Sequence, residues 1–104
     1  MAERRIIWGP EAKKQINEIL HYYNNRNKSK TYSRKLRNLL QKNIRLLQKH
    51  PHMGKHLSDD YRVLFIAHYH LFYEVTEDFL YIHNIWDGHR NPETVKYYRG
   101  TFSK

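Results

Sequence analysis

The stretch YRVLFIAHYHLFYEVTEDFLYIHNIW, residues 61–86, decides the fold class. It divides into three runs that are rich in aromatic and β-branched residues, at residues 61–67, 70–76 and 79–86. Two-residue connections separate the runs, at residues 68–69 and 77–78, and such short connections are typical of hairpins. We therefore expect a three-stranded antiparallel meander.

A different periodicity precedes this stretch. Residues 4–8 read as a short strand, and Gly9-Pro10-Glu11 then predicts a helix start, because proline suits the first helical position and an acid suits the first turn. One face of this helix carries the apolar residues Ala12, Ile16, Ile19, Leu20 and Tyr23. A second helix ends before Pro51, and its apolar stripe is Tyr32, Leu36, Leu39, Leu40, Ile44 and Leu47. The two helices should form an antiparallel hairpin.

Two further segments complete the expected order. Residues 50–60, HPHMGKHLSDD, have no sustained period, so we expect a connecting loop. Asn91-Pro92-Glu93 is typical of a helix start and predicts a short last helix over residues 92–99. The sequence thus predicts one α+β domain over residues 1–104, in the order β-α-α-β-β-β and a short C-terminal helix. In this fold a small antiparallel sheet is packed on one face by the helical hairpin.

Composition limits the class of protein. The chain has 104 residues, a formal charge of +9 and no cysteine. The lack of cysteine excludes a disulfide framework, a thiolate nucleophile and any Cys-containing metal site. The chain does not start like a secretory signal, and its longest strictly apolar run, residues 63–67, is far shorter than the roughly 20 residues that cross a bilayer. We expect a soluble protein of the cytoplasm.

The positive charge is concentrated in the first half. Between Ile19 and Ser58 there are ten Lys and Arg residues and no acid. Such a field attracts polyanions, of which nucleic acid is the commonest in the cytoplasm; the alternative is a solvated helix face. The expected contacts to nucleic acid are Arg34, Lys35, Arg37, Lys42 and Arg45, with Tyr97 and Tyr98 as candidates for stacking on bases.

Several segments carry a family resemblance when they are taken in order. They are a tryptophan shortly before PEA (residues 8–12), LLQKHP (46–51), MGK (53–55), YRVL (61–64), HLFYEV (70–75) and IWDGHRNP (85–92). Together they resemble the RelE/ParE superfamily of toxins from bacterial type II toxin–antitoxin pairs, over nearly the whole chain. The resemblance implies a RelE-like fold and a small antitoxin that binds the toxin.

The branches of this superfamily attack different targets. RelE-like members cut messenger RNA on the ribosome without a metal, whereas ParE-like members poison DNA gyrase. Our main expectation is a metal-independent, ribosome-dependent mRNA endoribonuclease that needs no cofactor and has the antitoxin, the ribosome and mRNA as partners. The alternative is a gyrase poison without hydrolytic activity.

A metal-free ribonuclease needs proton carriers beside fixed cations, because it must deprotonate the 2′-hydroxyl and stabilise charge at the phosphorus. Arg62 is the first candidate, since strand alternation places it opposite Tyr61 and Val63 and its guanidinium can bind phosphate bidentately. The resemblance aligns Arg62 with an arginine that RelE-like enzymes use at the scissile phosphate. An ordinary surface or ion-paired arginine is the alternative.

Four more residues are candidates for catalysis. Lys55 and His56 lie just before the strand of Arg62, while His89 and Arg90 follow the last strand and should return toward Arg62 if the strands pair in register. An imidazole can act as acid or base near neutrality, because its ordinary pKa is about 6.5. Many relatives carry an arginine where this chain has His89, so His89 or Arg90 takes that role or the site is not catalytic.

Geometry should discriminate between the branches. A nuclease requires Arg62, one of His89 and Arg90, and one of Lys55 and His56 within reach of a single phosphate. If these side chains are scattered, the gyrase alternative or a toxin that has lost its activity is favoured.

Overall fold

The order of helices and strands follows the prediction. The computed structural model describes residues 4–27 and 30–88. It contains β1 (Arg5–Trp8), α1 (Pro10–Asn27), α2 (Thr31–Lys49), β2 (Lys55–Ser58), β3 (Tyr61–Ile66), β4 (Tyr69–Val75) and β5 (Phe79–Asp87). The short last helix expected over residues 92–99 lies outside the described residues.

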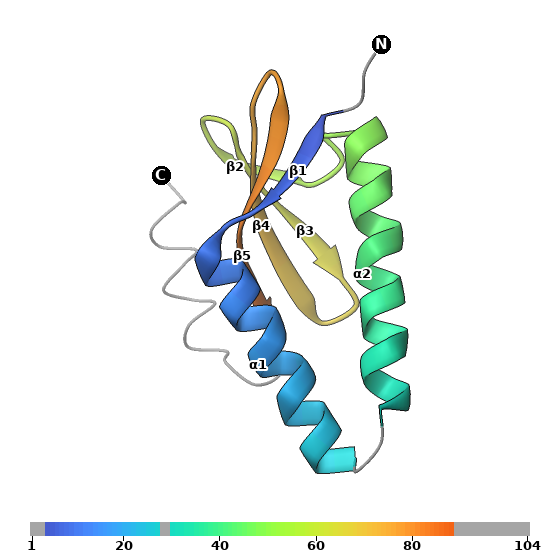
Figure 1. Cartoon of the computed structure of the whole chain (residues 1–104). Helices are drawn as coiled ribbons and strands as arrows, with labels where there is room; N and C mark the ends of the chain where they lie inside the picture. The colour runs from blue at the N-terminus through green and yellow to red at the C-terminus, as the bar shows by residue number, and fades with distance from the viewer. Residues whose placement is uncertain (1–3, 28–29, 89–104) are drawn as a thin grey trace.

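The five strands form one sheet in the order β1-β5-β4-β3-β2. The predicted meander β3-β4-β5 is antiparallel throughout. The α+β fold class is therefore confirmed, but the sheet is mixed rather than purely antiparallel, because β1 pairs with β5 in parallel. This pairing is possible because α1 and the following elements carry the chain away from β1 and back before β5 is added beside it (Figure 1).

Two further details of the sequence prediction were wrong. The expected loop over residues 50–60 contains the edge strand β2, which forms because β3 offers it a partner, with Lys55 opposite Val63 and His56 opposite Arg62. The turn expected at residues 68–69 falls one residue earlier, because Ala67 adopts a positive φ of 54° and Tyr69 is already paired in β4.

Both helices cover the same face of the sheet. Ile19 and Leu20 of α1 and Leu36, Leu40 and Leu47 of α2 share one core cluster with β4 and β5. The predicted stripe of α2 holds except at Leu39, whose side chain is 38% exposed. A smaller cluster of Val63, Phe72, Trp86 and Leu57 lies on the other face. No helix of the described chain is long and apolar enough to span a membrane.

An irregularity in β5 fixes α1 on the sheet. The register shifts between Phe72, which faces Asn84, and Tyr73, which faces Ile82. The Gln15 side chain of α1 binds at this bulge: its Oε1 accepts the Ile85 amide proton at 2.8 Å, and its Nε2 donates to Asn84 Oδ1 at 3.1 Å. Such side-chain bonds satisfy polar groups that a bulge leaves without a ladder partner.

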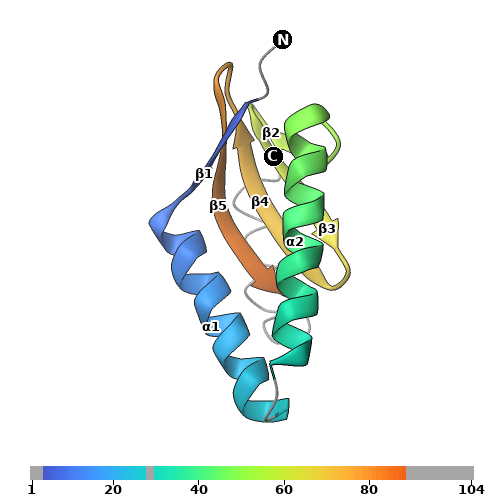
Figure 2. The same cartoon turned by 45° about the vertical axis from the view of Figure 1, so that its right-hand side comes forward.

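Tyrosine hydroxyls tie the helices to the sheet near the α1–α2 connection, where the two helices converge (Figures 1 and 2). Tyr23 of α1 donates to Asp87 Oδ2 at 2.7 Å, and the hydroxyls of Tyr32 and Tyr69 lie 2.7 Å apart. Asp87 is only 1% exposed. Burial and the bond to Asp87 raise the pKa of Tyr23 to about 12.

This raised pKa predicts a loss of stability in alkali. The unfolded chain releases the Tyr23 proton near the ordinary pKa of 10.0, whereas the folded chain holds it to about 12. The stabilisation is therefore complete below pH 10 and declines as the pH rises toward 12. Urea titrations at pH 8 to 11 should show a shallower decline in the unfolding free energy of Tyr23→Phe than of the parent chain. An identical pH dependence in both would contradict the contribution of Tyr23.

Candidate functional site

The segment between α2 and β2 is held in place by two side chains from the sheet. The Tyr73 hydroxyl accepts the Gly54 amide proton at 2.9 Å and donates to the Pro51 carbonyl at 2.9 Å. Arg62, directly opposite Tyr73 in the sheet, donates from Nη1 to the Gly54 carbonyl at 2.8 Å and to the His52 carbonyl at 3.2 Å. Burial raises the pKa of Tyr73, so this hydroxyl stays protonated. Arg62 is therefore a loop anchor in this structure.

Of the other predicted residues, Lys55 lies on the opposite face from Arg62, whereas His56 shares its face. Lys55 pairs with Val63, and paired residues share a face, so Lys55 projects from the face opposite Arg62. His56 pairs with Arg62 and shares its face, but its Nε2 is hydrogen-bonded to the Asp59 carbonyl at 2.8 Å. His89 and Arg90 lie outside the described residues. The three described members of the predicted catalytic set are thus divided between two faces of the sheet.

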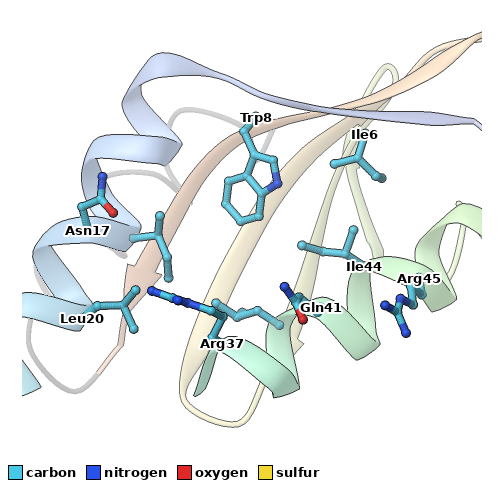
Figure 3. Close-up of a pocket in the computed structure, with 10 residues that line it drawn as sticks. Ile6, Trp8, Asn17, Leu20, Arg37, Gln41, Ile44 and Arg45 are labelled. Atoms are coloured by element: carbon cyan, nitrogen blue, oxygen red, sulfur yellow. The ribbon is translucent and has the colours of Figure 1, made fainter. Parts of the chain in front are cut away.

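The structure contains a groove that the sequence analysis missed, between α1 and α2 where the helices diverge. Its volume is about 500 Å³. Figure 3 shows Trp8 pointing from β1 into the space between the helices and Arg37 reaching from α2 toward Leu20. The lining residues are Ile6, Trp8, Ile16, Asn17, Leu20, Arg37, Leu40, Gln41, Ile44 and Arg45.

The chemistry of this groove is apolar at the base and cationic at the rim. Six aliphatic or aromatic side chains line it, while Arg37 and Arg45 are exposed at its edge. Such a surface suits a segment that inserts an apolar side chain and places carboxylates against the arginines. The sequence signal for this groove is weak. Ile6, Trp8 and Ile16 have the pattern of ordinary core residues, and they differ from the core only in being partly rather than fully buried.

The cations predicted to bind nucleic acid are all exposed on α2, but they do not all lie on one surface. Arg37 and Arg45 line the groove, whereas Lys42 and Arg45 line a shallow hollow on the outer side of the same helix. Arg34 and Lys35 are exposed near its N-terminal end. Tyr97 and Tyr98 lie outside the described residues. Across residues 4–27 and 30–88, no group of His, Asp and Glu side chains is arranged to hold a metal ion.

A sequence model of one family matches most of the chain, and a solved structure shares its fold. Residues 6–92 match the sequence model of the family described as the ParE toxin of the type II toxin–antitoxin system parDE. A solved structure described as a chromosomal ParDE TA system from P. aeruginosa superposes with a TM-score of 0.66 and 15% identity. The match covers 80% of this chain and 94% of that chain, and at this identity it supports the fold alone. No curated protein matches the chain significantly.

Removing the anchors of residues 51–54 should destabilise the chain. Arg62→Met keeps the apolar stem but removes the two bonds to loop carbonyls, and Tyr73→Phe leaves the buried Gly54 amide without its acceptor. Each change should lower the unfolding free energy, measured in urea, by about 1–3 kcal/mol. Because both side chains hold the same segment, the double variant should lose less than the sum of the two. Strictly additive losses would show that the two anchors act independently.

Proposed function

The chain belongs to the ParE toxin family of type II toxin–antitoxin systems, and from this membership we propose that it poisons DNA gyrase and does not itself cleave nucleic acid. Family membership over residues 6–92 is the observation that carries this proposal. It favours the gyrase alternative over the main sequence-based expectation, an mRNA endoribonuclease.

The hydrogen bonds of Arg62 favour the same choice, while His56 shares the face of Arg62 and His89 and Arg90 lie outside the described residues. Cleavage of RNA without a metal needs several proton-transferring and cationic groups around one phosphate. In the described part of the chain, Arg62 is bonded to loop carbonyls and Lys55 projects from the other face of the sheet. A protein that acts by binding gyrase needs no such convergence. Catalysis by Arg62, Lys55, His56, His89 or Arg90 stays a prediction of the alternative function.

The proposed partner that inhibits the toxin is a cognate antitoxin, which we place in the groove between α1 and α2. The chain carries ten cations without an acid between Ile19 and Ser58, so an acidic, partly disordered segment that folds on binding is its natural complement. The groove offers such a segment an apolar base beneath Trp8 and two arginines at the rim.

Expression of the chain without antitoxin tests the proposed target. Gyrase-dependent double-strand breaks should accumulate while ribosome-bound messages stay intact. With purified components, linear DNA should form only when gyrase, DNA and the toxin are present together. Arg62→Lys, which keeps the charge at the loop, serves as a control, because a gyrase poison does not require bidentate phosphate binding there. Rapid message cleavage without gyrase-linked breaks would overturn the proposal and restore the nuclease.

Charge reversal at the rim tests the antitoxin site. Arg37→Glu with Arg45→Glu should weaken antitoxin binding by at least about tenfold, roughly 1.4 kcal/mol, since carboxylates that faced the arginines would then meet like charge. The matched control is Lys13→Glu with Lys14→Glu, an equal charge change at exposed positions of α1 outside the groove. Isothermal titration provides the affinities. Equal losses in both variants would show that net charge, and not the groove, determines binding.

A further inference from the structure

The side of α2 that faces away from the sheet is rich in hydrogen-bond donors and has no carboxylate. We call it the donor face and define it by Lys35, Asn38, Gln41, Lys42, Arg45 and Lys49, all exposed. They lie opposite the buried stripe of Leu36, Leu40, Ile44 and Leu47. Most of them line a shallow hollow of about 400 Å³. Each of the six side chains has at least one N–H group that can donate to an anionic oxygen.

Within residues 4–27 and 30–88, no acid forms an ion pair with this face. α2 has no Asp or Glu along its length. Between residues that the structure describes, the pairs at ion-pair distance are His68 with Asp87 and His83 with Glu74, so none involves a cation of α2. Ordinary surfaces mix charges of both signs, whereas a run of one sign points to an oppositely charged partner.

The cations are regularly spaced along the helix. Lys35, Lys42 and Lys49 are seven residues apart, two helical turns, so they project from nearly the same side. At 1.5 Å per residue they are separated by about 10 Å and span about 21 Å. One strand of B-DNA presents a phosphate about every 3.4 Å along its axis, so this row can face roughly six phosphates.

We propose that the donor face of α2 binds the phosphate backbone of duplex DNA without reading its sequence. This inference rests on the proposed function and deepens it, since a gyrase poison acts beside the duplex that the enzyme holds. The toxin would contact the DNA as well as the protein of the cleavage complex. No aromatic side chain belongs to the donor face, and single-stranded nucleic acid is usually bound through aromatic stacking. The chemistry therefore fits a duplex backbone.

Two other occupants fit less well. A second copy of this chain would set lysines against lysines, because α2 has no acid to offer its counterpart. An acidic amphipathic helix would need an apolar seam, but of the side chains that line the hollow only Leu46 is apolar, and it is 39% exposed. Binding of an acidic helix is therefore measured alongside binding of DNA.

Fluorescence anisotropy with a labelled 20-base-pair duplex tests the proposal. The purified chain should bind two duplexes of unrelated sequence equally well, and its affinity should fall steeply with salt. Lys35→Gln, Lys42→Gln and Lys49→Gln together should weaken binding by about tenfold or more and reduce the salt slope by about three, near one unit for each lost phosphate contact. Glutamine favours helix, so α2 should be retained, as circular dichroism can verify.

The matched control removes three cations elsewhere. Arg5→Gln, Lys13→Gln and Lys14→Gln together lower the net charge equally, at exposed positions on β1 and α1, and should leave the salt slope nearly unchanged. Equal loss in both triple variants would overturn the donor face as the contact. Tighter binding to a helical glutamate-rich peptide than to DNA would overturn it in favour of an acidic protein.

Gyrase assays separate this inference from the proposed function. If the donor-face variant traps gyrase on DNA as efficiently as the parent chain, the DNA contact is overturned while the gyrase function stands. If the parent chain binds DNA as expected but produces no gyrase-dependent breaks, the gyrase function fails while the DNA contact stands. A weaker trapping by the variant at unchanged affinity for gyrase alone supports both.

Discussion

Burial of one face of β4 and β5 beneath the two helices is the constraint on which the rest of the structure depends. Leu71, Tyr73, Leu80, Ile82 and Ile85 are all nearly inaccessible to solvent. Because successive residues of a strand point to opposite faces, this burial sets the direction of every neighbouring side chain in the sheet. It places Arg62 beside Tyr73 on the helix side and Lys55 on the other side.

The same constraint organises the charge. Once Leu36, Leu40 and Leu47 of α2 are buried against the sheet, the remaining surface of that helix must face solvent or the space next to α1. Its cations are therefore distributed over two surfaces, with Arg37 at the groove and Lys42 on the outer side. Gln41 and Arg45 lie between the two surfaces and line both. A ligand in the groove and a ligand on the outer side would thus share these two side chains.

The alternation of side chains between the two faces of the sheet also bears on the choice between the two toxin activities. A nuclease site at this position would require residues from β2, β3 and the chain after β5 to project together. The pairing of β2 with β3 instead separates Lys55 from Arg62, and the Arg62 guanidinium holds the carbonyls that follow Pro51. The fold leaves the cations of α2 exposed to solvent.

Local periodicity in the sequence was enough to determine most of the secondary structure. The apolar spacing of α1 and the alternation in β3, β4 and β5 act between near neighbours, so they can be recognised without a structure. The ordered segments from Trp8 to Pro92 likewise indicated the RelE/ParE superfamily, which the family match confirms. The branch remained open in the sequence, because both kinds of toxin share these segments.

Contacts between distant residues were decided only by the tertiary structure. The parallel pairing of β1 with β5, the addition of β2 and the exposure of Leu39 depend on which surfaces happen to meet. The groove is defined in the same way, since Trp8 and Arg37 are 29 positions apart and become neighbours only when the helices diverge over β1. Sequence patterns report the preferences of a segment, whereas the free energy of burying one segment against another depends on the whole fold.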